Sequence, residues 1–234
     1  MNKEFDFSEF FDKSIVADCL INLEEPAAVE IKAHKLILAN SSNFFFNMFT
    51  GQMDEELTGT VNLKYNPGNL LPAAIKWMYN GKIFYEDYDI ESLLKLYAVS
   101  AFYTIENLQN ELKKVISAKI PQTEMLKYCD YCYKQNLNET LNYLAVLIGE
   151  KLEKYEDISK MSDILDVRVY ALALKNSNLS TRKKLENIEQ FIGDYEMIKQ
   201  DIDDLKQAIH TSNDKEQTNK IIEEFPNFLC LIEK

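Results

Sequence analysis

The chain has 234 residues, of which 46% are hydrophobic, and its formal net charge is -12. This length suits one large domain or two small ones, and the apolar content is high enough to bury a core. A surface this acidic repels phosphate groups, which disfavours nonspecific binding to nucleic acid or to an anionic membrane. Glycine and proline are scarce, which favours helices over a turn-rich all-β fold.

Membrane and export signals are not evident in the sequence. No uncharged apolar run approaches the roughly 18 residues that a membrane-spanning helix needs. The N-terminus lacks the basic start and apolar run of a signal peptide, and we find no lipidation motif. The four cysteines are scattered, which suits a reducing compartment. We therefore expect a cytoplasmic protein, with the nucleus as an alternative, and no membrane or nucleic-acid partner.

A segment with four phenylalanines opens the chain. Helical spacing places Phe7, Phe10 and Phe11 on one side, where they must cover either their own domain or a second copy. Residues 19–23 and 28–33 then alternate apolar and polar side chains around a polar turn. This two-residue period predicts a β-hairpin.

Short amphipathic helices dominate the rest of the first half. The polar break Asn40-Ser41-Ser42 separates a first helix from a second one that is rich in aromatic residues. Residues 61–63 fit a short strand, and residues 70–79 carry apolar side chains at helical spacing. Two further helices follow, for which we expect Asp89 and Thr104 to be the N-caps.

The second half of the chain is expected to contain only helices. Pro121 marks the first domain boundary, because a helix cannot easily continue through proline. A polar break separates residues 121–176 from a tail of residues 181–234. Apolar residues spaced by threes and fours from Leu185 to Ile209 predict one long helix with a near-heptad seam. We expect this seam to be buried, either against the preceding helices or in a coiled coil with a second chain.

Six pieces of the first half occur in a family-typical order. They are Asp18-Cys19-Leu20-Ile21, Ala33-His34-Lys35-Leu36, Ser41-Ser42 with Met48-Phe49, Val61-Asn62-Leu63, Tyr79-Asn80-Gly81, and Leu93-Leu94-Lys95-Leu96-Tyr97-Ala98. In this order they resemble the BTB/POZ domain, a protein-interaction fold. The resemblance implies an N-terminal segment of residues 1–17 and an α+β domain of residues 18–118, in which helices flank a small sheet.

Residues 121–176 resemble the helical BACK region that often follows a BTB domain in cullin-type ubiquitin-ligase adaptors. Helix order and the connector at residues 158–165 carry this likeness. Adaptors of this architecture usually have a separate substrate-recognition domain, such as a β-propeller. This sequence departs from that pattern, because a helical tail stands where such a domain would be.

The resemblance also implies a cullin-contact site. Met53-Asp54-Glu55 matches the hydrophobic residue, any residue and glutamate that such adaptors carry after the aromatic helix. Phe49, Met53 and Glu55 are therefore candidate cullin contacts, with Met53 as an exposed apolar anchor. The alternative is a solvated acidic loop that happens to contain a methionine.

A dimer interface is the second implication of the resemblance. Phe7, Phe10 and Phe11 are candidates for it, and Asp18 and Lys35 occupy the positions of a charged pair near the dimer groove. The alternative for Asp18 and Lys35 is a structural link between the first strand and the first helix.

We find no catalytic constellation. His34 has no potential metal ligands near it and fits a core or capping position, and Cys129-Asp130-Tyr131-Cys132 has no second pair to complete a zinc site. Glycine-rich phosphate loops and nucleophile elbows are missing. We therefore expect two core-facing cysteines, no metal or cofactor, and no enzyme.

The sequence thus predicts a protein-interaction adaptor. It would dimerise through its BTB domain and bring an unidentified client to a cullin scaffold. The alternative is a homo-oligomeric scaffold without a cullin partner.

Overall fold

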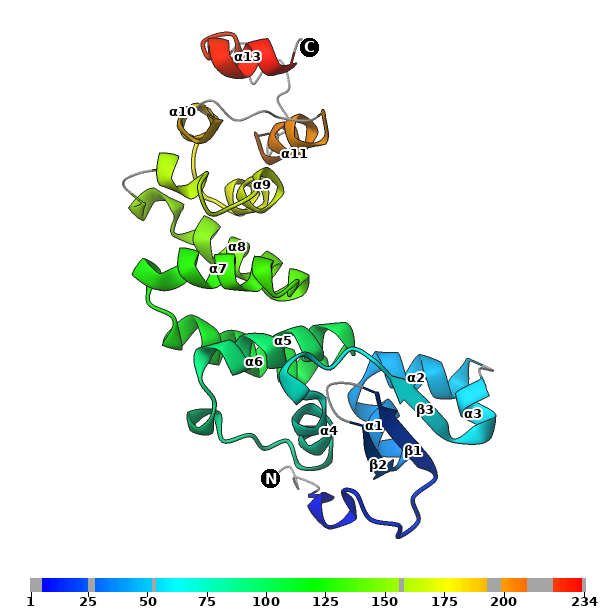
Figure 1. The fold of residues 1–234 in the computed structure, drawn as a ribbon. Coiled ribbons are helices and arrows are strands. Elements are labelled where there is room, and N and C mark those ends of the chain that lie inside the picture. The colour runs from blue at the N-terminus through cyan, green and yellow to red at the C-terminus, as the bar shows by residue number, and fades with distance from the viewer. Residues whose placement is uncertain are drawn as a thin grey trace, which may run out of the picture. The chain divides into compact units, whose positions relative to one another are not determined.

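The computed structural model describes residues 6–24, 28–51, 54–155, 158–192, 199–209 and 221–232. These residues form two compact units, one that ends at Ile120 and one that begins at Pro121 (Figure 1). The first unit combines a sheet with helices, and the described part of the second unit is helical. This α+β unit followed by a helical region is the fold class that the sequence predicted.

A three-stranded sheet lies at the N-terminal end of the first unit. Its strands are β1 (Cys19–Leu23), β2 (Val29–Ala33) and β3 (Thr60–Leu63), in the order β2-β1-β3. β1 pairs antiparallel with β2 and parallel with β3. Cys19, Ile21 and Leu23 are buried, as the period of two expected for a strand requires. The predicted hairpin and the predicted third strand are therefore confirmed.

The first unit contains six described α-helices. They are α1 (Lys35–Ser41), α2 (Asn43–Thr50), α3 (Asp54–Thr58), α4 (Leu71–Asn80), α5 (Ile90–Phe102) and α6 (Glu106–Lys119), and the short 3-10 turns are η1 (Ser8–Phe10), η2 (Pro67–Asn69) and η3 (Tyr85–Asp87). Asp89 caps α5 as predicted, because its side chain accepts a hydrogen bond from the backbone N–H of Ser92.

The predicted cap at Thr104 is wrong. Thr104 has a φ of 47°, and α6 begins two residues later, at Glu106. The Thr104 hydroxyl instead accepts a hydrogen bond of 2.7 Å from the backbone N–H of Phe44. The side chain therefore links the segment after α5 to the start of α2, a long-range contact that a local capping pattern does not reveal.

The second unit contains six described α-helices. They are α7 (Met125–Lys134), α8 (Asn138–Glu150), α9 (Val167–Lys175), α10 (Thr181–Ile192), α11 (Lys199–Ile209) and α13 (Pro226–Ile232), and the short turns are η4 (Gln122–Glu124), η5 (Leu152–Lys154) and η6 (Ser159–Met161). α8 packs against α7 and α9, and α11 packs against α9. The core of the unit lies between these helices.

The prediction of one long helix in the tail is wrong. Lys184 in α10 donates a hydrogen bond of 3.1 Å from Nζ to the carbonyl oxygen of Ala208 in α11. These two residues would stand about 36 Å apart along a single continuous helix. The described residues between Leu185 and Ile209 therefore belong to two separate helices, α10 and α11, and the first turn of α10 lies beside the last turn of α11.

The apolar seam of the tail is nevertheless buried at most of its described positions, with Ile202 half-buried. Leu185, Ile188, Leu205 and Ile209 are each at most 1% exposed. α11 packs against α9, and α10 packs against η6. The first of the two alternatives, burial within the chain, accounts for these residues; Tyr195 and Ile198 of the seam lie outside the described residues.

Candidate partner-binding surface

Exposed and half-buried aromatic side chains gather where α2 begins and α5 ends. Phe102 is 49% exposed, its ring lies 6.4 Å from that of Phe44, and it stacks on Tyr65 with 4.4 Å between ring centroids. We call Phe44, Tyr65 and Phe102 the aromatic patch. Phe46, also on α2, is half exposed as well. Exposed apolar groups of this kind are typical of surfaces that bind another protein.

Hydrogen bonds hold the aromatic patch in place from beneath. The Ser42 hydroxyl donates to the carbonyl oxygen of Tyr103 at 2.6 Å, and the Tyr103 hydroxyl donates to that of Tyr65 at 2.9 Å. Burial raises the pKa of the Tyr103 phenol above its ordinary value, so this group remains a donor. The patch is thus presented by a fixed backbone, which lowers the entropy cost of binding.

The three predicted cullin contacts differ in their surroundings. Phe49 is buried, stacks on Phe45 at 6.0 Å, and has the Lys35 ammonium 5.7 Å from its ring centroid. Glu55 is half-buried in α3, which packs against α2. Met53 lies outside the described residues.

Leu57 is a surface residue that the sequence reasoning missed. It lies in α3, two residues after Glu55, and is 86% exposed. The hydrophobicity of a leucine in a short acidic segment does not tell whether it points inward, so the sequence held no signal for its exposure. α3 therefore presents an apolar side chain beside acidic ones.

The N-terminal phenylalanines contact their own domain. Phe10 lies 5.9 Å from the ring of His34, and Phe11 lies 5.5 Å from the ring of Tyr79. The backbone N–H of Phe7 donates to the carbonyl oxygen of Tyr79 at 2.8 Å, and its side chain is 39% exposed. Of the three rings, that of Phe7 is the most available to a second molecule.

His34 occupies the buried position that the sequence predicted. Its Nδ1 lies 2.9 Å from the Tyr79 hydroxyl, and its Nε2 lies 2.9 Å from the carbonyl oxygen of Ile15. Burial raises the pKa of Tyr79 to about 12. This histidine therefore joins the N-terminal segment to α4 and has a structural role.

Asp18 and Lys35 are brought together by the fold. Asp18 Oδ1 accepts a hydrogen bond of 2.8 Å from the backbone N–H of Lys35, the first residue of α1. This bond links the residue before β1 to the start of α1. It fits the alternative of a structural link between the first strand and the first helix. The bond involves the backbone of Lys35 and not its ammonium group.

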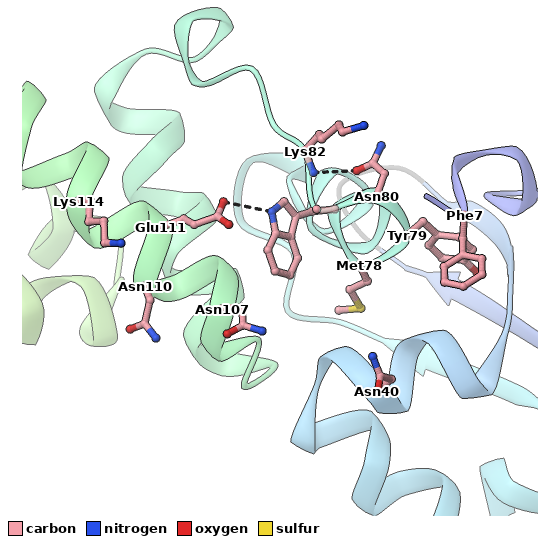
Figure 2. Close-up of a pocket in the computed structure, with 12 residues that line it drawn as sticks. Phe7, Asn40, Met78, Tyr79, Asn80, Lys82, Asn107, Asn110, Glu111 and Lys114 are labelled. Carbon is pink, nitrogen blue, oxygen red and sulfur yellow. Dashed lines mark hydrogen bonds between the residues drawn. The ribbon is translucent and has the colours of Figure 1, made fainter. Parts of the chain in front are cut away.

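A pocket of about 630 Å³ lies between α4 and α6 (Figure 2). Trp77, Met78 and Tyr79 contribute buried side chains, and the exposed amides of Asn40, Asn107 and Asn110 also line it. Amides both donate and accept hydrogen bonds, which suits a polar ligand such as a peptide main chain. The sequence analysis missed this pocket because its residues come from three separate helices.

Glu111 fixes one wall of this pocket. Its Oε2 accepts hydrogen bonds from Trp77 Nε1 at 3.3 Å and from the Tyr85 hydroxyl at 2.6 Å. Burial, together with this carboxylate, raises the pKa of Tyr85, so its hydroxyl remains a donor. Figure 2 shows the Glu111 side chain extending from α6 into the pocket, with a dashed line for the hydrogen bond that Trp77 Nε1 donates to it.

His, Cys, Asp and Glu side chains are dispersed in the described part of the chain. Within it, no group of three or more His, Cys, Asp and Glu side chains could hold a metal ion. Cys129 and Cys132 are buried in the second unit, as predicted, and burial raises the pKa of the Cys132 thiol to about 12. Among the same residues, no helix has the length and apolar composition to cross a bilayer.

Comparison with known protein families identifies the first unit. The family model of the BTB/POZ domain matches residues 7–120. The first unit is a BTB/POZ domain. The match includes the sheet and the helices that carry the aromatic patch, the N-terminal phenylalanines and the pocket. It ends where the helical second unit begins.

Curated relatives match part of this chain in sequence. Human Kelch-like protein 3 is 33% identical over 95 residues, which cover 40% of this chain and 16% of that protein. Human Kelch-like protein 28 is 36% identical over 66 residues, or 28% of this chain and 12% of that protein. Human Kelch-like protein 2 is 32% identical over 95 residues, again 40% and 16%. The aligned region thus spans about a sixth of these relatives or less.

The BTB domain assigns a coarse function. BTB domains are protein-interaction modules, and the aromatic patch and Leu57 provide exposed apolar groups for such a role. The first unit is therefore a protein-interaction module.

Proposed function

We propose that this protein is an adaptor that binds a cullin scaffold through α2 and α3 of its BTB domain and recruits a client to it. The exposed Leu57 on α3, beside half-buried Glu55 and exposed Asp54, carries this proposal. An apolar anchor ringed by charged groups is the usual composition of a binding hot spot. The aromatic patch on α2 and α5 would extend the contact.

The helical second unit would act in client recruitment, in the manner of a BACK-like region. Its six described helices belong to one compact unit, which offers a folded surface for a client. The client is an unidentified protein. The protein would act in the cytoplasm or the nucleus.

A homodimer through the N-terminal face of the BTB domain is part of the proposal. Ile15, Val16 and Leu36 are 58%, 76% and 80% exposed, and Phe7 is 39% exposed. Val16 has a φ of 49°, which a β-branched residue rarely adopts and which costs free energy. Burial of these apolar side chains against a second copy would offset that cost.

Binding to the purified N-terminal domain of a cullin tests the proposal. We expect Met53→Ala to weaken binding by about 1–2 kcal/mol, in the range of a moderate hot spot, and Leu57→Ala to weaken it similarly. Glu55→Lys should weaken it further, because it places the wrong charge at the contact. Biolayer interferometry gives the dissociation constants, and circular dichroism verifies that each variant folds.

Tyr133→Ala is the matched control, because Tyr133 is 57% exposed but lies on α7 in the second unit. It should leave cullin binding unchanged. If the wild-type protein binds no cullin, the adaptor proposal fails. The homo-oligomeric scaffold then becomes the better account, and the exposed Ile15, Val16 and Leu36 would support it.

A further inference from the structure

The pocket between α4 and α6 belongs entirely to the BTB domain. Its residues come from the N-terminal segment, from α1, from α4 with the turn that follows it, and from α6. Its volume of about 630 Å³ is that of an ordinary ligand site. Glu55, Leu57 and the aromatic patch do not line it, so it is separate from the cullin contact proposed above.

Side-chain amides in the pocket are available to a ligand. Asn40, Asn107 and Asn110 are exposed, and their amides make no hydrogen bond with any residue that the structure describes. Each amide can donate to a carbonyl oxygen and accept from an N–H group. A peptide group offers both partners at once, so these amides match the main chain of a peptide.

Three of the lining side chains follow one face of α6. Asn107, Asn110 and Lys114 are spaced by three and four residues, and such residues are neighbours on a helix surface. Figure 2 shows all three side chains on this helix. At a rise of about 1.5 Å per residue, the row is about 10 Å long. An extended chain covers that length with about three residues.

The charges in the pocket favour an acidic ligand. The Lys114 ammonium is exposed and forms no ion pair within the described part of the chain. Lys82 pairs with Asp6 at 3.1 Å, but the pair is exposed and therefore weak. Glu111 is the one acidic residue among the described ones that line the pocket, and its carboxylate already accepts two hydrogen bonds. The pocket can therefore attract a carboxylate although the whole chain is acidic.

We propose that this pocket binds an extended acidic peptide of a partner protein. Asn107 and Asn110 pair with the peptide main chain, and Lys114 pairs with an Asp or Glu side chain. Trp77 and Met78, each 7% exposed, form an apolar floor for a neighbouring side chain of the peptide. This site lies within the BTB domain and does not depend on cullin binding.

A random peptide library can test this site. Dodecapeptides displayed on phage are selected on the purified full chain, and we expect enrichment of peptides with Asp or Glu close to an apolar residue. The most enriched peptide is then labelled with a fluorophore and titrated into the chain. Asn107→Ala, Asn110→Ala and Lys114→Glu should each weaken its binding about tenfold, because each removes a hydrogen-bonded or charged contact.

Matched variants and a modified peptide make the test specific. Asn138 is exposed on α8 and Lys64 is exposed after β3, so Asn138→Ala and Lys64→Glu should leave the dissociation constant unchanged. Thermal unfolding verifies that each variant folds. N-methylation of the peptide amides should weaken binding, because it removes the main-chain donors.

Enrichment of no peptide, or of peptides without acidic residues, would overturn the proposal. So would an affinity that the three pocket variants or N-methylation leave unchanged. Displacement of the peptide by acetate alone would indicate a simple carboxylate site. A lower oligomer mass for Asn107→Ala or Asn110→Ala would indicate that a second copy of the chain occupies the pocket. Either of these two results would also overturn the proposal.

Discussion

Gly149 lies where α8 meets α9 and has no room for a side chain. A Cβ atom there would overlap the carbonyl oxygen of Ala173 and lie 3.2 Å from the backbone carbon of Asn176. Alanine normally favours a helix over glycine by about 1 kcal/mol. The clash involves backbone atoms, which cannot rotate away, so packing decides the outcome at this position.

We predict that Gly149→Ala lowers the free energy of unfolding by about 1–3 kcal/mol, as overpacking in a core does. Urea unfolding followed by circular dichroism measures this change. Gly81→Ala is a useful comparison, because Gly81 has a φ of 65° but no atom within 4 Å of its would-be Cβ. A Gly149→Ala variant as stable as the wild type would show that α8 and α9 are not packed this closely.

Lys184 is a buried cation, so its titration should change the free energy of unfolding with pH. It is 1% exposed, and desolvation lowers its pKa from 10.5. Below the pKa that Lys184 has in the folded protein, its amine is protonated in both the folded and the unfolded state. Burial of the charged ammonium then destabilises the folded state. Between that pKa and 10.5 the unfolded state binds more protons, so stability rises with pH.

We therefore predict that the wild type gains stability relative to Lys184→Met as pH rises toward 10.5. Methionine has a similar length but no charge, so the variant lacks this increment. Urea unfolding at a series of alkaline pH values measures the difference between the two proteins. A difference that stays constant across the whole range would contradict the assignment.

At the scale of single residues, the sequence predicted roles that depend on local pattern. Asp89 caps α5, and Cys129 and Cys132 are buried in the core, because helical periodicity and capping rules act over a few residues. The helix cap predicted at Thr104 was wrong, and the exposure of Leu57 was not predicted. The surroundings of Thr104 are set by Phe44, which is distant in the chain.

Among the elements, the N-terminal segment has two separable roles. Phe11 packs against Tyr79, whereas Phe7 is more exposed. We predict that Phe11→Ala lowers the stability of the BTB domain by about 1–2 kcal/mol, because it removes a half-buried ring, and leaves the oligomer mass unchanged. Phe7→Asp should instead lower the oligomer mass with little loss of stability.

Light scattering and thermal unfolding distinguish these two outcomes. Asn110→Asp, an exposed position on α6, is a control for added charge. If Phe11→Ala changed the mass and not the stability, the ring would serve the dimer and not its own domain. A wild-type chain that is already a monomer would remove the dimer proposal altogether.

Most strands and helices of the first half followed from periodicity, apart from α3 and the start of α6, but the tail shows where periodicity fails. The spacing of apolar residues through α10 and α11 mimics one continuous seam, since both helices bury their stripes within the same unit. The sequence places Gly193 directly after Ile192, and a glycine at such a position weakens a helix. The prediction of one long helix rested on the spacing of apolar residues and did not take Gly193 into account.

For the molecule as a whole, the order of short motifs was enough to predict the α+β BTB domain and the helical region after it. The aromatic patch was not predicted, because Phe44, Tyr65 and Phe102 meet only through tertiary packing. The pocket between α4 and α6 was missed for the same reason. Surfaces that are assembled from distant segments can be identified only from the structure, whereas motifs within one segment can be identified from the sequence.

The most direct test of the adaptor proposal is the mass of the protein in solution with a cullin N-terminal domain. We predict that light scattering coupled to size exclusion, at about 10 µM of each protein, gives one peak with the mass of two chains and two cullin domains. Leu57→Ala should reduce that peak, and Tyr133→Ala should not. Two separate peaks with the masses of the unmixed proteins would contradict the proposal.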